Sequence, residues 1–340
     1  MTSGSSVCLA TYNGGRFLGR QLESLSEQTQ AAAEVVIVDD ASTDNTIDEI
    51  ESFRERAPFE VRLVRNRTRL GAVASFEQAV AMAQGAVIFL CDQDDVWHPE
   101  KLERFAAKFQ DCPTADGVFS DSTVFTDKPT AAGRSLFDLL GFPPDDRAAS
   151  AAGIDVQLLL RRNVVSGHSL AFRASARHIL LPFSSRLYHD AWIALLLAAS
   201  GRLVVIDRPL VWHRQHEANL VGPRRVLSLA AARSSMQRSQ RELSRLASGY
   251  GEVSERLATM ETGADRGVER AGVLLREKVA HLELRASLDH RRLHRLRPIV
   301  RELRAGGYRR FSASQTAAFT DLFSVRADSA ADGRPAANRR

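Results

Sequence analysis

Four short apolar runs, separated by amphipathic stretches, most constrain how this chain can fold. They are rich in Val and Ile, as strands buried in a sheet are. The runs are SVCLAT (5–10), EVVIVDD (34–40), EVRLVRN (60–66) and AVIFLC (86–91). Apolar residues at helical spacing follow each of the first three runs. Strand–helix–strand repeats of this length make right-handed crossovers, so we predict a mostly parallel α/β sheet with helices on both faces.

A polar cluster follows each of the four predicted strands at its carboxyl end. These clusters are residues 11–13, 39–40, 66–69 and 92–95. Parallel strands bring their carboxyl ends to one edge of the sheet, which is where ligands bind in such folds. We therefore expect the four clusters to line one site.

The fourth cluster places three carboxylates, Asp92, Asp94 and Asp95, within four residues. Their charges would repel one another at neutral pH unless a positive group lay between them. Carboxylates on a strand-end loop suit a hard divalent cation, Mg²⁺ or Mn²⁺. The alternative is structural: Asp95 could cap a helix that begins near Pro99.

Composition bounds the class of protein. Of 340 residues, 44% are hydrophobic and 26% are charged, as in ordinary globular proteins. The chain has no apolar run of about 18 residues and no signal-like N-terminus. The three cysteines, Cys8, Cys91 and Cys112, form no CxxC pair, which favours a reduced, cytoplasmic setting.

Charge divides the chain into two parts. Residues 1–223 carry 22 Lys and Arg against 28 Asp and Glu, whereas 224–310 carry 20 against 10. The acidic front part argues against nucleic-acid binding. We predict a catalytic domain at 1–223, a basic helical region at 224–325 and a disordered tail at 326–340. The basic region either packs an apolar stripe on the front domain or contacts an anionic membrane or a partner.

The stretches VCLATYNGGRFLGRQLESLSEQT, EVVIVDDASTDNT and RNRTRLGAVASFEQAVAMAQGAVIFLCDQDDVWHPEKL resemble the family 2 glycosyltransferases of the GT-A fold. The resemblance covers roughly residues 4–223. YHDAW and HRQHEANLVG resemble the rhamnosyltransferase-like subset that assembles surface polysaccharides. The resemblance implies inverting transfer of one sugar from a UDP- or dTDP-linked donor to a glycan or lipid-linked acceptor, with Mn²⁺ or Mg²⁺. A degenerate scaffold protein is the alternative.

The resemblance also implies which residues hold the nucleotide. A carboxylate there accepts the N3–H of uracil or thymine, and this is Asp40 or, as the alternative, Asp39. Asn66 and Arg69 are weaker candidates for the diphosphate end of the donor. The implied nucleotide-binding set is Thr11, Tyr12, Asn13, Asp39, Asp40, Arg69 and Asp92.

The diphosphate end follows from the same resemblance. Asp94 matches the metal-binding aspartate, and His216 is a further candidate ligand. Arg214 could neutralise the departing diphosphate, an electrostatic task that dominates many such transfers. A lone histidine is more often structural, and this alternative stays open for His213 and His216.

The general base is expected in YHDAW, where Asp190 matches the family's carboxylate and His189 replaces a glutamate. A base must remove the acceptor hydroxyl's proton as it attacks. The alternative is that Asp190 only caps the helix it begins. By position, Ser166, Gly167 and His168 are expected on the acceptor side. Two aromatic residues could stack on sugar but are expected in the core: Trp97 and Trp192.

Overall fold

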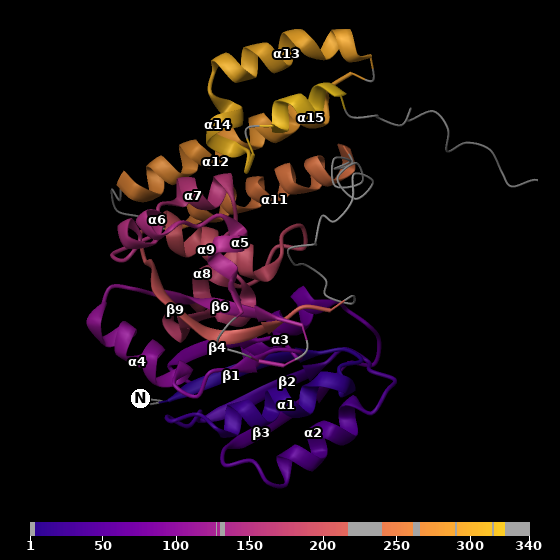
Figure 1. Cartoon of the computed structure of the whole chain (residues 1–340), viewed down its shortest axis with the longest axis vertical. Coiled ribbons are helices and arrows are strands. Elements are labelled where there is room, and N and C mark those ends of the chain that lie inside the picture. The colour runs from indigo at the N-terminus through magenta and orange to yellow at the C-terminus, as the bar shows by residue number, and fades with distance from the viewer. Residues whose placement is uncertain are drawn as a thin grey trace, which may run out of the picture.

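The computed structural model describes residues 4–126, 128–129, 133–216, 240–260, 266–289, 291–314 and 316–323. The expected domain boundary near Pro223 and the tail at 326–340 lie outside these residues. Figure 1 shows a sheet at the lower part of the molecule and helices stacked above it.

Within the described residues, nine strands form one mixed sheet in the order β3-β2-β1-β4-β8-β6-β9-β5, with β7 paired to β6. The first four strands are β1 (Ser5–Thr11), β2 (Glu34–Asp39), β3 (Glu60–Arg65) and β4 (Val87–Cys91). They are parallel, as predicted from their apolar runs. This half of the sheet has the arrangement that the sequence resemblance predicts for a GT-A fold.

The second half of the sheet has both strand directions. Its strands are β5 (Val96–Trp97), β6 (Gly117–Phe125), β7 (Arg134–Ser135), β8 (Leu170–Arg173) and β9 (Leu203–Arg214). β8 runs antiparallel to β4 and β6, and β5 runs antiparallel to β9. β9 is one long strand whose register against β6 shifts near Pro209, which has no N–H to donate to the ladder. It brings the chain back to the loop that follows β4.

Helices cover both faces of the sheet, and this explains why the strands are apolar without interruption. Val35 and Ile37 face one core, whereas Val36 and Val38 face the other, because successive strand residues point to opposite sides. The first core contains α1 (Gly15–Ser26), α2 (Thr46–Arg54) and α4 (Lys101–Asp111). The second contains α3 (Ala72–Met82), α5 (Leu136–Leu140), α7 (Val156–Arg161), α8 (Arg177–Leu180) and α9 (His189–Ala199), with α6 (Pro144–Ala149) beside β9.

Two long helices of the basic region extend the second core. They are α11 (Gln240–Thr259) and α12 (Arg266–Ala286). Leu257 and Leu275 are buried in the same cluster as Ile193 of α9. Arg256 donates to the carbonyl oxygens of Ile179 and Leu181. These two helices therefore pack against the N-terminal part of the chain, on α8 and α9.

The last three described helices form a smaller layer farther out, at the top of Figure 1. They are α13 (Arg292–Arg304), α14 (Gly307–Phe311) and α15 (Ala317–Phe323). Ile299 and Tyr308 are buried in their own small core. None of the described helices is both long and apolar enough to span a bilayer.

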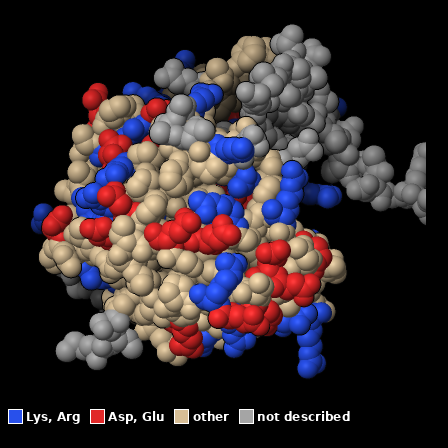
Figure 2. Space-filling view, turned by 60° about the horizontal axis from the view of Figure 1, so that its bottom comes forward, with Lys and Arg blue, Asp and Glu red and all other residues tan. Residues whose placement is uncertain are grey.

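Charges of both signs are mixed on the opposite end of the molecule. Figure 2 brings the bottom of Figure 1 forward, and Asp and Glu alternate there with Lys and Arg over the described residues in view. Such mixing gives no sustained potential of one sign.

Leu275→Ala tests the packing of α12. Removing this fully buried side chain should lower the free energy of unfolding by about 2–5 kcal/mol, because it leaves a cavity in the shared core. Val273→Ala on the exposed face of the same helix is the control and should change it by less than about 0.5 kcal/mol. Chemical denaturation measures both, and equal small effects would contradict the packing.

Candidate active site

The carboxyl ends of β1 to β4 meet at one edge of the sheet, as the sequence predicted. The Thr11 hydroxyl donates to Asp39 Oδ1 at 3.0 Å across this edge. Gln93 joins the first and fourth loops, since its side-chain amide accepts from Tyr12 N at 2.9 Å and donates to Tyr12 O at 3.1 Å. No sequence pattern marks Gln93 beyond its place between the aspartates.

Asp40 anchors the loop that leads into α3. It accepts the backbone N–H groups of Leu70 at 2.7 Å and Gly71 at 2.8 Å, and the Asn66 side chain at 3.1 Å. Gly71 has φ +93°, a conformation that favours glycine. Asp39 is likewise bonded internally, to the backbone N–H and hydroxyl of Ser42. A bond from a nucleotide base to either carboxylate would add to these.

Tyr12, Asn13 and Arg69 lie at the same edge. The Arg69 guanidinium stacks 3.9 Å from the centroid of the Tyr12 ring. Asn13, in the left-handed region at φ +47°, accepts the Thr43 N–H at 2.8 Å. The structure thus brings the predicted nucleotide-binding residues of the first three loops together.

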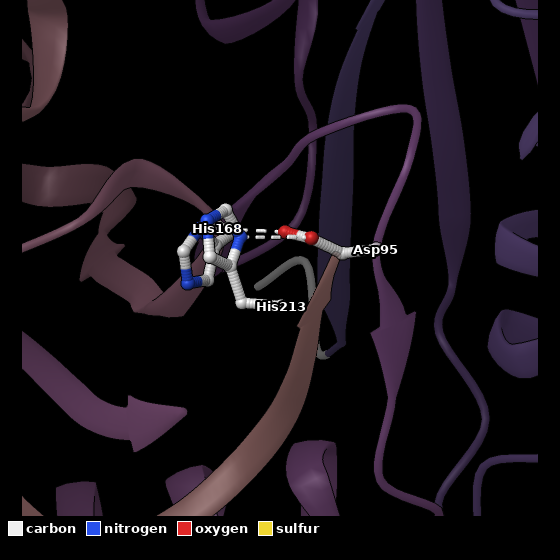
Figure 3. Close-up of side chains that lie close together, drawn as sticks. All are labelled: Asp95, His168 and His213. Atoms are coloured by element: carbon white, nitrogen blue, oxygen red, sulfur yellow. Dashed lines mark hydrogen bonds and ion pairs between the residues drawn. The ribbon is translucent and has the colours of Figure 1, made fainter. Parts of the chain in front are cut away.

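A buried ion pair lies beneath the fourth loop. Asp95 is fully buried, and His213 Nδ1 on β9 lies 2.9 Å from its Oδ1. His168 Nδ1 lies 3.3 Å from Oδ2, and the two imidazoles are stacked 4.5 Å apart on the same side of the carboxylate (Figure 3). The expectation that Asp95 caps a helix is wrong, because α4 begins at Lys101 and the Asp95 carboxylate points to the histidines.

The neighbouring imidazoles explain how the Asp95 carboxylate can remain charged although it is fully buried. Burial alone would raise its pKa, but the His213 and His168 imidazoles outweigh it and hold the pKa well below the usual range. Burial opposes protonation of His213, yet the Asp95 charge wins and raises its pKa to about 9. The two groups are therefore a carboxylate and an imidazolium at neutral pH.

Lys101 supports the cluster from below. It is fully buried at the start of α4, and its Nζ donates to the His168 carbonyl oxygen at 2.7 Å. The ammonium lies 3.3 Å from the Trp97 ring centroid, and burial lowers its pKa to about 7. Trp97 and Trp192 are both buried, as expected of core residues. Sequence patterns alone did not identify Lys101.

Asp94 and His216 form a second, more open pair. Asp94 Oδ2 lies 2.7 Å from His216 Nε2, and both side chains are partly accessible. Burial, together with the charges of Asp95 and Asp92, raises the pKa of Asp94 to about 7. Carboxylate oxygen and imidazole nitrogen suit Mn²⁺, and carboxylate oxygen suits Mg²⁺. The Asp94 carboxylate and the His216 imidazole therefore offer ligand atoms that fit a divalent cation.

A second donor group is the buried trio Asp95, His168 and His213, whose ligand atoms lie within 4.8 Å of one another. Their mutual ion pair already satisfies the Asp95 charge. Asp92, by contrast, has a half-exposed side chain, with one oxygen 3.7 Å from His168 Nδ1.

Arg214 holds the frame of the fourth loop. Its backbone N–H donates to Asp95 Oδ1, and its Nε donates to the Asp94 carbonyl, both at 2.9 Å. The guanidinium lies against the rings of Phe17 and Phe125, and Phe17 also stacks on His216 at 4.8 Å. Arg214 is thus adjacent to the Asp94–His216 pair.

Asp190 lies in the first turn of α9, where it accepts the Ala191 N–H at 2.7 Å. Burial raises its pKa, and Asp92 and His168 are near enough to influence its charge. The contact with Ala191 is compatible with both the capping and the catalytic hypotheses. His189 beside it is buried on Phe76, and neither ring nitrogen has a hydrogen-bond partner in the described residues.

The residues predicted on the acceptor side contact both the Asp95 cluster and His189 at the start of α9. His168 belongs to the Asp95 cluster, and Gly167 contacts His189 so closely that a Cβ would lie 2.8 Å from its Nε2. Ser166, partly buried, accepts the Ser169 N–H through its carbonyl oxygen. These contacts join the carboxylate cluster to the start of α9.

Comparison with known proteins agrees with the geometry. Residues 6–151 match the family model of glycosyl transferase family 2. An uncharacterised glycosyltransferase of Nostoc sp. is 30% identical over 227 residues, which cover 63% of this chain and 65% of that protein. The putative glycosyltransferase EpsE of Bacillus subtilis is 32% identical over 102 residues, covering 30% and 37%. The chain spans less than two thirds of the length of these curated relatives.

Solved structures share the fold. S. aureus TarS in complex with UDP-GlcNAc superposes with a TM-score of 0.54 at 17% identity, covering 92% of this chain and 89% of that one. The mannosyltransferase PcManGT of Pyrobaculum calidifontis, in complex with GDP-Man and Mn²⁺, gives 0.52 at 18% identity, covering 94% and 86%.

His213→Ala should lower the free energy of unfolding by about 3–5 kcal/mol, because it leaves the Asp95 charge buried and unpaired. His213→Asn should cost less, since it keeps a donor but no charge. The advantage of wild type over His213→Asn should be full below about pH 6.5 and shrink as pH rises through about 9, where His213 loses its proton. Chemical denaturation across this pH range measures it.

His294→Asn is the matched control, because His294 pairs with Asp289 at 3.1 Å on the surface. It should change stability by less than about 1 kcal/mol. Equal costs at both positions, or an advantage that grows above pH 9, would contradict the buried ion pair.

Cation affinity should fall with pH below about 7, because the ion must displace a proton from Asp94. One released proton corresponds to roughly a tenfold loss of Mn²⁺ affinity per pH unit. Calorimetry in buffers of different ionisation enthalpy counts the proton. Asp94→Asn should abolish both binding and release, and an affinity that is constant from about pH 5.5 to 7 would contradict the assignment.

Proposed function

We propose that this chain is a family 2 glycosyltransferase that moves one sugar from a nucleoside-diphosphate donor to a hydroxyl acceptor with inversion at the anomeric carbon. The observation that carries the proposal is the position of Asp94 and His216. Asp94 belongs to the loop after β4, which Gln93 joins to Tyr12 at the nucleotide end and in which Asp92 is near enough to Asp190 to influence its charge.

The nucleotide end of the donor is assigned to the first three loops. Tyr12 and the stacked Arg69 offer a flat surface for the base, and Asp40 or Asp39 offers a carboxylate oxygen to its N3–H. Thr11, Asn13 and Asp92 complete the assigned set near the ribose. A uracil or thymine base suits these acceptors, since its N3–H is a donor.

Asp94 and His216 would hold Mn²⁺ or Mg²⁺. The ion, when bound, supplies positive charge to the diphosphate of the donor. Arg214, whose Nε donates to the Asp94 carbonyl oxygen, offsets charge on the same leaving group from its place between Phe17 and Phe125. The buried Asp95–His213 pair keeps the loop in place from below.

Asp190 is assigned as the general base. The acceptor oxygen attacks the anomeric carbon while its proton passes to the Asp190 carboxylate, and the bond from that carbon to the diphosphate oxygen breaks. Burial, which raises the pKa of Asp190, makes the carboxylate a better proton acceptor. Ser166, Gly167 and His168 are assigned to the acceptor side beside it.

The finer assignments rest on the sequence resemblance. They are rhamnose as the sugar, a role in surface-polysaccharide assembly, a glycan or lipid-linked acceptor, and a cytoplasmic protein that meets the inner face of the membrane through residues 224–310. A scaffold that has lost turnover is the competing function, and nucleotide release in a screen of sugar nucleotides with Mn²⁺ or Mg²⁺ separates the two.

Asp190→Asn tests the proposed reaction. It keeps the size of the side chain but removes its basicity, so transfer should fall by about 10²–10⁴-fold while donor affinity and melting temperature stay close to wild type. Asp155→Asn is the control, because Asp155 accepts a backbone N–H at the start of α7 outside the site. It should leave transfer unchanged.

Near-normal transfer by Asp190→Asn with a lowered melting temperature would favour the capping explanation. A product of retained configuration, read by NMR, would reject the inverting reaction. Binding of a nucleotide without transfer by the wild-type chain from any donor would favour the scaffold.

A further inference from the structure

Helix α13 carries an apolar stripe that the described residues leave uncovered. The four side chains follow one another at intervals of three and four residues, so they lie along one side of the helix. They are Leu293 at 79% exposure, Leu296 at 42%, Val300 at 40% and Leu303 at 48%. The inward side of the same helix is formed by the buried Arg295 and Ile299. The stripe therefore contributes nothing to the core of this layer.

Arginines border the stripe. Arg292, Arg297, Arg301 and Arg304 are exposed on α13. The only acidic residue of this helix, Glu302, turns inward, with Oε1 2.7 Å from His281 Nδ1. The outer side of α13 thus presents apolar and basic groups together, unlike the mixed surface of Figure 2.

A hollow of about 680 Å³ adjoins the arginine row, between α12, α13 and α14. Arg297, Arg301 and Arg310 line it together with two glutamates. Glu277 is paired with Arg310, and Glu302 with His281. Among the described residues neither Arg297 nor Arg301 forms a salt bridge, although Arg301 lies near enough to Glu302 to lower the pKa of that carboxyl, so both guanidinium groups can still contact an anion.

We propose that α13 lies in the surface of an anionic lipid bilayer. The apolar stripe lies at the boundary between the lipid headgroups and the acyl chains, and the arginines contact lipid phosphates. An apolar side bordered by Arg is the pattern of helices that bind this interface. The proposal deepens the membrane contact of the proposed function by naming the element that makes it. Its test needs no sugar transfer, so the two can fail separately.

A second copy of this chain fits the stripe less well. An isologous contact would place the same four arginines opposite one another, and like charges repel. A nucleic acid would use the arginines but leave the stripe in water. A bilayer with anionic headgroups satisfies both features.

Co-sedimentation of the full chain with vesicles tests the proposal. Vesicles of phosphatidylcholine with about 30% phosphatidylglycerol should bind the wild type, and raising salt should weaken binding. Leu293→Ser with Leu296→Ser, and separately Arg297→Glu with Arg301→Glu, should each lower the partition coefficient at least about tenfold. The four side chains are exposed, so the variants should keep the wild-type melting temperature.

Arg20→Glu with Arg54→Glu is the matched control, because these arginines are half-exposed on α1 and α2 at the other end of the molecule. It makes the same change of charge and should leave binding within about twofold of wild type. The proposal would be overturned if the wild-type chain stayed in the supernatant with anionic vesicles as well as with neutral ones. Stripe variants that bind normally would also overturn it, as would light scattering that shows a dimer lost in the Leu293→Ser and Leu296→Ser variant.

Discussion

The ion pair between Asp95 and His213 is the interaction on which the rest of the site depends. It fastens the loop after β4 to the end of β9, and the Arg214 N–H binds the same carboxylate oxygen. Asp94 is the neighbour of Asp95 in sequence, and His216 lies three residues after His213. The position of the Asp95–His213 ion pair therefore sets the positions of Asp94 and His216. A buried pair of charges stabilises a protein only when its geometry offsets the cost of burial. His168 lies 3.3 Å from the second Asp95 oxygen and helps to lower the pKa of this carboxyl, although that oxygen accepts no hydrogen bond from the described residues.

Positive charge in this region is arranged by depth. The imidazolium of His213 lies beneath the loop, where it and the His168 imidazole hold the pKa of Asp95 low. Closer to solvent, Asp94 pairs with His216, and its pKa is raised to about 7. The protein thus neutralises the inner carboxylate with its own side chains, whereas the outer carboxylate is the one assigned to the proposed cation.

Site residues whose positions depend on local sequence could be predicted, whereas contacts between residues far apart in the chain could not. Apolar runs and parallel strands place Asp39, Asp40 and Asp94 at one edge by local rules, and the structure has them there. The partners of Asp95 could not be found in this way, because His213 is 118 residues away and a lone histidine carries no pattern. The alternative that Asp95 caps a helix arises because Pro99 is its close neighbour in sequence. Strand direction after β4 also depends on long-range pairing, which periodicity does not encode.

The close approach of Gly167 to His189 has a consequence for how such sites diverge. Because a Cβ at position 167 would lie 2.8 Å from the imidazole nitrogen, a larger residue there would require the buried His189 ring to shift. A shorter side chain at 189 removes that limit and opens room for alanine or serine at 167. The two positions, 22 residues apart in sequence, should therefore change together through descent.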